Sequence, residues 1–187
     1  MWTVVMLFFV GCSSSIKKGG ALSGSRDSVP VMVTYDVNTV ISDSGVTRYR
    51  VTSPEWAVYD RAAEPCWIFP KGLHLEKFDE NLDVYAKVDA DSAIYFSNLE
   101  IWHLVGHVNA MNVEGEHFES ELLIVSQKED RVYTDKFIKI TQKKRIINGT
   151  GFESNQNLSR YTILNPQGVF PIDDDEDAAA DSLDSTL

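Results

Sequence analysis

Apolar and polar residues alternate along most of the chain between residues 31 and 171, and no stretch there sustains the 3.6-residue spacing of a helix. The clearest segment has an apolar residue at every second position, namely Leu82, Val84, Ala86, Val88 and Ala90. Residues 102–108 repeat the arrangement, with Trp102, Leu104, Gly106 and Val108 on one side. A period of two is typical of a strand that buries one face, so the pattern predicts an all-β fold.

Residues that favour turns separate these alternating segments. Turns are predicted at residues 43–45, 70–72, 97–98, 114–116, 128–130 and 148–149. A loose internal repeat is also visible, because a separation of 11 residues links the pairs Trp56 and Trp67, Asp91 and Trp102, and Glu121 and Val132. Each pair brackets a strand, a polar turn and a second strand. Single hairpins cannot bury their apolar faces, so the sequence predicts stacked hairpins in an antiparallel meander, sandwich or open barrel.

The N-terminus has the features of a lipoprotein export signal. Residues 4–10 form an unbroken apolar run, far shorter than the roughly 20 residues needed to cross a bilayer. The run ends at Gly11 and Cys12, as in a lipobox, so residues 1–11 are predicted to be a signal peptide and Cys12 to carry lipid. An ordinary cleaved signal peptide is the alternative. Residues 12–30 are rich in Ser and Gly and are predicted to form a flexible tether.

Charge is distributed unevenly along the chain. The formal net charge is −11, and residues 173–187 hold seven acidic residues and no basic one. These residues are therefore predicted to be a disordered acidic tail that follows one folded domain over residues 31–172. The acidic balance and the lack of a basic stripe argue against nucleic acid as a partner.

No motif for catalysis, a metal or a cofactor is recognisable. His103 and His107 lie four residues apart, which on a strand separates them by roughly 13 Å and prevents them from sharing a metal ion. His74 and His117 have no partner at ligand spacing. Cys66 lies among apolar residues without a nearby cation, as expected of a buried structural thiol. We therefore expect a protein that is not an enzyme, with no catalytic residue, no metal and no cofactor.

Large aromatic residues recur near the predicted strand centres and turns. The chain has 4 Trp, 7 Tyr and 9 Phe. In one interpretation they simply fill the core of a closed sandwich. In the other, two incompletely closed sheets leave an apolar trough that could hold acyl chains. The sequence pattern is compatible with both.

From about residue 40 to residue 172 the chain resembles the LptC family of periplasmic components of the lipopolysaccharide-export transporter, in a lipoprotein form. The segments that carry the resemblance are residues 41–49 (ISDSGVTRY), 55–56 (EW), 67–72 (WIFPKG), 102–108 (WHLVGHV), 118–122 (FESEL), 131–137 (RVYTDKF), 151–155 (GFESN) and 161–163 (YTI). Residues 102–108 match an alternating Trp-x-Leu-x-Gly-x-Val run of the family. The acidic tail belongs to no family motif, and many relatives have a transmembrane anchor where this chain has a lipobox.

The resemblance implies a twisted antiparallel β-jellyroll, an open V-shaped sandwich built from repeated hairpins. It implies a periplasmic, lipid-anchored bridge, at the inner membrane rather than the outer membrane. Such a bridge receives lipopolysaccharide by its acyl chains from the subunits of an inner-membrane ABC transporter and passes it to a soluble LptA-like bridge protein. A structural or carbohydrate-binding surface lipoprotein with a closed β-sandwich is the alternative.

Two sets of residues are expected to carry this function. The trough is predicted to be lined by Trp56, Trp67, Phe69, Leu75, Val84, Trp102, Leu104, Val108, Phe118 and Leu122. The docking edge is predicted to be an unpaired C-terminal strand formed by Arg160, Tyr161, Thr162, Ile163 and Leu164, and ended by Asn165 and Pro166.

Overall fold

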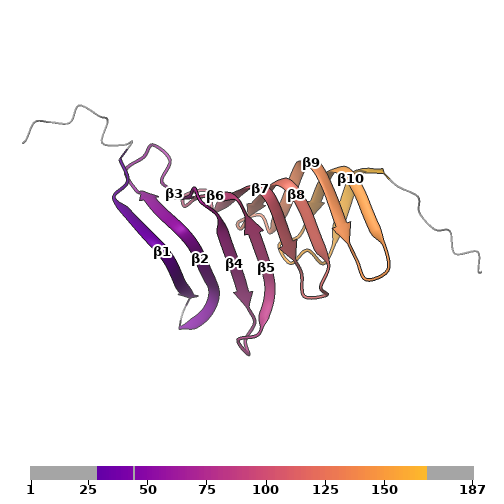
Figure 1. Cartoon of the computed structure of the whole chain (residues 1–187), viewed down its shortest axis with the longest axis horizontal. Coiled ribbons are helices and arrows are strands. Elements are labelled where there is room, and N and C mark those ends of the chain that lie inside the picture. The colour runs from indigo at the N-terminus through magenta and orange to yellow at the C-terminus, as the bar shows by residue number, and fades with distance from the viewer. Residues whose placement is uncertain (1–28, 44, 168–187) are drawn as a thin grey trace, which may run out of the picture.

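The computed structural model describes residues 29–43 and 45–167, and its secondary structure consists of strands and turns (Figure 1). The strands are β1 (Met32–Asp43), β2 (Val46–Tyr59), β3 (Cys66–Phe69), β4 (Leu73–Phe78), β5 (Val84–Ala90), β6 (Ser92–Phe96), β7 (Ile101–Met111), β8 (His117–Ser126), β9 (Arg131–Thr141), β10 (Ile146–Ser154) and β11 (Tyr161–Gln167). The predicted signal peptide, Cys12, most of the tether and the acidic tail lie outside the described residues. Within the described residues no helix could span a membrane.

All of the strands join one antiparallel sheet, which confirms the predicted all-β jellyroll class. β7 to β11 form a meander in which each strand pairs with the next, as stacked hairpins should. In Figure 1, β1 lies at one end of the molecule and β10 near the other, with β4 and β5 between them. The long axis of the molecule therefore runs across the strands.

The sheet is folded into two halves because β2 and β7 each pair with different strands along their lengths. Half-sheet A contains β4 and β5, which pair with residues 49–52 of β2 and residues 109–111 of β7. Half-sheet B contains β3 and β6, which pair with residues 57–59 of β2 and residues 101–105 of β7. The pairings thus run in a closed circuit, and the two halves can enclose a space between their inner faces.

Several of the long strands have register shifts along their length, and in β7 the shift lies between the residues that pair with the two half-sheets. In β7 the register shifts between Val105 and Val108, where Gly106 and His107 have φ angles of 77° and 41°. Such bulges bend a strand and increase its twist. A Cβ atom on Gly106 would lie 2.6 Å from the Asp91 side chain, so this position requires glycine for both its φ angle and its space. Similar shifts occur in β8 between residues 120 and 124 and in β10 between residues 150 and 152.

The core consists largely of the inner faces of the two halves. In half-sheet B five aromatic rings form a closed set of contacts with centroid separations of 4.6–5.9 Å, made by Trp56, Trp67, Tyr95, Trp102 and Phe69. Towards the C-terminus a second group, Phe118, Phe152 and Tyr161, packs with centroid separations of 5.4–5.8 Å. These groups belong to one hydrophobic cluster that runs along the molecule.

Three details of the sequence prediction were wrong. Asn148 and Gly149 lie inside β10 and form no turn. The glycine at position 149 instead allows β11 to lie close to β10, since a Cβ there would be 2.7 Å from the Asn165 carbonyl oxygen. Leu82 precedes β5, has a φ of 67° and is 60% exposed. β11 continues through Pro166 to Gln167, as an edge strand can, because the missing N–H of proline is tolerated there.

Candidate functional site

An apolar cavity of about 320 Å³ lies between the inner faces of the two half-sheets. The wall from half-sheet A contains Leu73, Leu75 and Lys77 of β4 together with Ala86 and Val88 of β5. The β4–β5 register pairs Lys77 with Ala86 and Leu75 with Val88, so these side chains share one face of the sheet. The volume is at the lower end of the range of about 300–1,000 Å³ for small-molecule pockets.

The opposite wall is aromatic and aliphatic. Trp67, Tyr95 and Trp102 are directly paired across β3, β6 and β7, with centroid separations of 5.2 Å and 4.6 Å. Leu104 and Leu123 continue this wall. Burial raises the pKa of the Tyr95 hydroxyl, whose proton is donated to Gln127 Oε1 at 3.2 Å. The wall is therefore uncharged as well as largely apolar.

The structure places four of the ten predicted trough residues on this cavity: Trp67, Leu75, Trp102 and Leu104. Phe69, Val108 and Phe118 are almost completely buried and lie in the core away from it. Trp56 packs on Trp67 and Phe69, behind the cavity wall, and Val84 is 38% exposed at the start of β5. Leu122 pairs with the exposed Val105 on the outer face, whereas its neighbour Leu123 pairs with Leu104 and lines the cavity.

The sequence pattern did not identify three of the residues that line the cavity, namely Tyr95, Val88 and Leu123. Val88 belongs to the alternating run that was recognised, so its position was available from the pattern. For Leu123 the signal was ambiguous, because β8 contains the adjacent apolar pair Leu122 and Leu123 beside a register shift. Only the pairing with β7 decides which of the two points inward.

The loop between β10 and β11, residues 155–160, connects the two half-sheets at one end of the cavity. On the side of half-sheet A, Lys77 Nζ donates to Asn157 Oδ1 at 3.3 Å, and Asn112 Nδ2 donates to the Leu158 carbonyl oxygen at 3.1 Å. On the side of half-sheet B, Gln156 Nε2 donates to the Gln127 carbonyl oxygen at 2.9 Å. Leu158 is buried and lines the cavity. This loop therefore closes part of the gap between the two halves.

Lys77 is the charged group that faces the cavity at this end. Burial lowers the pKa of its ammonium, with the charge of Asp130 acting in the opposite direction and that of Arg48 adding to the decrease. The ammonium also lies 5.5 Å from the centroid of the Tyr85 ring. Within residues 29–43 and 45–167 no carboxylate lies within ion-pair distance of Lys77.

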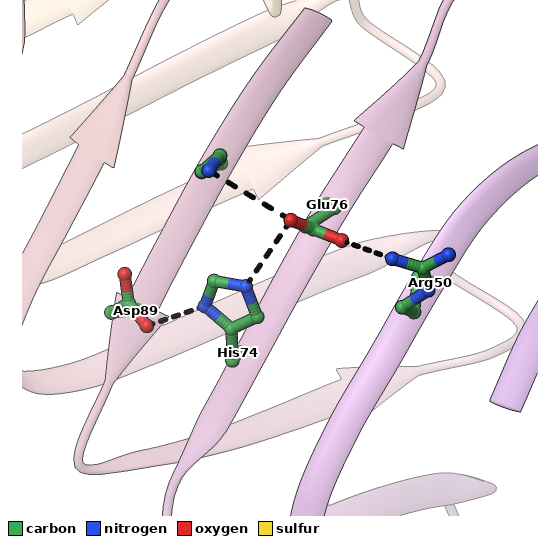
Figure 2. Close-up of polar contacts among 5 residues, drawn as sticks. Arg50, His74, Glu76 and Asp89 are labelled. Carbon is green, nitrogen blue, oxygen red and sulfur yellow. Dashed lines mark hydrogen bonds and ion pairs between the residues drawn. The ribbon is translucent and has the colours of Figure 1, made fainter. Parts of the chain in front are cut away.

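The outer face of half-sheet A carries a separate set of charged side chains (Figure 2). Glu76 forms ion pairs with Arg50 at 2.9 Å and with Lys87 at 3.8 Å. His74 Nδ1 lies 2.6 Å from Asp89, and its Nε2 lies 3.7 Å from Glu76. Because side chains alternate along a strand, this network faces away from the cavity. Partly exposed pairs of this kind contribute little stability but favour the register of neighbouring strands.

Within the described residues, the four histidines and Cys66 do not form a catalytic arrangement. A hydrogen bond of 2.6 Å to Asp91 raises the pKa of the exposed His107 imidazole, and the charges of Asp91 and Glu121 add to the effect. Burial, and then the charge of Glu64, raises the pKa of the Cys66 thiol, which disfavours the thiolate that nucleophilic chemistry would need. Among the described residues no group of three His, Cys, Asp or Glu side chains is placed to hold a metal ion.

The sheet has a free edge strand near each end. β1 pairs with β2 alone and β11 pairs with β10 alone, so far as the described residues extend. Of the predicted docking residues, Tyr161, Thr162, Ile163 and Leu164 lie in β11, and Arg160 ends the preceding loop. β1 carries large exposed apolar side chains, with Val31, Val33 and Tyr35 exposed by 46%, 40% and 64% in and beside the strand.

The family model described as "Lipopolysaccharide-assembly, LptC-related" matches residues 3–168. This range includes all of the strands from β1 to β11. No curated protein matches the chain.

Proposed function

Because the chain belongs to the LptC-related family and so takes part in lipopolysaccharide assembly and transport, we propose that it is a periplasmic bridge for the lipid. It receives lipopolysaccharide from an inner-membrane ABC transporter and passes it towards the outer membrane. It acts by binding and handing on the lipid, without catalysing a reaction. The observation that carries the proposal is the apolar cavity of about 320 Å³ between the two half-sheets.

The cavity suits an acyl chain because its walls offer apolar contact along their length. Leu75 and Val88 lie on one wall, and Trp67, Trp102 and Leu104 lie on the other. Removing a methylene group from water is favourable by about 0.8 kcal/mol, so a chain gains stability with each segment that enters. The volume is that of a narrow space, so we propose that it holds part of the lipid and leaves the sugar head group outside.

The two edge strands support a role as a bridge between other proteins. A free edge presents unpaired N–H and C=O groups that can take up a strand from a partner. We propose that β11 binds a soluble LptA-like bridge protein and that β1, with its exposed Val31, Val33 and Tyr35, binds the transporter. Each added strand would extend the folded sheet and carry the apolar space across the interface.

Photo-crosslinking at neighbouring positions of β5 tests lipid binding in cells. Val88 lines the cavity, whereas the Asp89 side chain is 58% exposed on the other face. A photoreactive residue at position 88 should capture lipopolysaccharide on irradiation, and the same residue at position 89 is the matched control and should not. Equal capture at both positions, or capture at neither in folded protein, would contradict an acyl chain in this cavity.

We further propose that Cys12 attaches the protein to the inner membrane through a lipid. The motivation is the apolar run of residues 4–10 that leads to Gly11 and Cys12. In cells given labelled palmitate, the protein should incorporate label and the Cys12→Ser variant should lose it. A Cys66→Ser variant is the matched control and should keep it. Incorporation that is the same in all three proteins would rule out Cys12 as the attachment point.

A further inference from the structure

Two lysines contribute to the lining of the cavity, and they differ in what their ammonium groups contact. The Lys87 ammonium lies 3.8 Å from Glu76, in the network on the outer face of half-sheet A. Lys77 shares its face with Leu73 and Leu75, so its side chain belongs to the cavity wall. Its hydrogen-bond acceptor is the neutral amide oxygen of Asn157, at 3.3 Å. Among the residues that the structure describes, the Lys77 ammonium therefore has no carboxylate within ion-pair distance, and it lies at the end of an otherwise apolar wall.

We propose that Lys77 binds an anionic group, a phosphate or a carboxylate, of an amphiphile whose chain lies in the cavity. This inference rests on the proposed function and adds an orientation to it. The chain would run from Lys77 past Leu75 to Leu73, which spans about 13 Å at the usual rise per strand residue. The anionic group would remain beside the loop of residues 155–160, where Gln127 and Gln156 also contribute polar atoms.

The chemistry of the lysine favours such a ligand. An ammonium has three donors, and here one of them is used at a distance near the upper limit for a hydrogen bond. Burial lowers the pKa of Lys77 more than the nearby charge of Asp130 raises it, so the compensation of the charged form is incomplete in the unliganded protein. An incoming phosphate or carboxylate would compensate the charge of Lys77 through charge-assisted hydrogen bonds, which are stronger than those between neutral groups.

Amphiphiles that share one chain and differ in head group test this proposal on the full chain. Dodecyl phosphate, dodecanoate and uncharged dodecanol would each be used, below micellar concentrations, to displace the neutral fluorescent probe N-phenylnaphthylamine. The unmodified protein should bind both anions about tenfold more tightly than dodecanol, a difference expected of one charge-assisted contact. Lys77→Met should remove this preference and leave the affinity for dodecanol unchanged. Lys77→Arg should keep much of it.

Lys139→Met is the matched control, since Lys139 is a strand lysine that pairs with Glu119 at 2.6 Å and does not line the cavity, and this variant should behave like the unmodified protein. Circular dichroism would establish that each variant folds, and Lys77→Gln would replace Lys77→Met if the latter does not. A preference for dodecyl phosphate alone would mean that the site binds a lipid phosphate. A preference for both anions would mean that the site accepts a phosphate or a carboxylate. Anion preference that survives in Lys77→Met overturns the role of Lys77 alone. Failure of all three amphiphiles to displace the probe overturns the proposed lipid-binding function itself.

Discussion

Replacing Phe118 with alanine should lower the free energy of unfolding by about 3–5 kcal/mol, the usual cost of removing a large aromatic side chain from a closed core. Phe118 is completely buried, and its ring lies 5.7 Å from Phe152 and 5.4 Å from Tyr161. The substitution would leave a void between β8, β10 and β11 that the surrounding sheet cannot readily fill. Urea unfolding followed by circular dichroism would measure the change.

Phe137→Ala provides the matched control for this experiment. Phe137 lies on the neighbouring strand β9 but is 50% exposed, so its removal should cost well under half as much. Similar losses for the two variants would mean that the ring of Phe118 is not enclosed as described. A destabilised Phe118→Ala protein would also fail in lipid transport without any direct role of this residue in binding lipid.

The all-β class could be predicted from the sequence because it depends on local pattern. In β5 the alternation correctly placed Ala86, Val88 and Ala90 on the inner face. The prediction failed at Leu82, where the chain has a positive φ and has not yet entered the strand. Alternation identifies the two faces of a strand, but the strand ends depend on turn geometry that a hydrophobic pattern does not record.

The cavity lining was harder to predict because it depends on contacts between distant segments. Near the register shift of β8, a displacement of one residue exchanges Leu122 for Leu123 on the inner face. Phe69 and Trp102 have the same alternating context, yet Trp102 lines the cavity and Phe69 lies in the core. The contact of Lys77 with Asn157 joins residues 80 positions apart, and no local motif indicates it.

The orientation of the backbone in β11 determines how its proposed docking role can be tested. The Arg160 carbonyl oxygen accepts a hydrogen bond from the Asn155 N–H at 3.3 Å, so the backbone groups of Arg160 face β10. Backbone groups alternate in direction along an antiparallel strand, and the register pairs Thr162 with Glu153 and Ile163 with Phe152. We therefore infer that the N–H of Thr162 faces β10 and that the N–H of Ile163 faces the free edge.

Ile163→Pro should consequently abolish docking of a partner strand while preserving the pairing of β11 with β10. Proline removes the N–H that faces the free edge, where edge strands tolerate it. Ile163→Ala is the matched control, since it loses the same packing of the side chain against the core but keeps the N–H. In titrations with the soluble LptA-like bridge protein, the proline variant should bind more than tenfold more weakly than the alanine variant. Lipid capture at position 88 should persist in both variants, because the cavity lies away from β11. Equal affinity of the two folded variants for the bridge protein would place the docking edge on another strand.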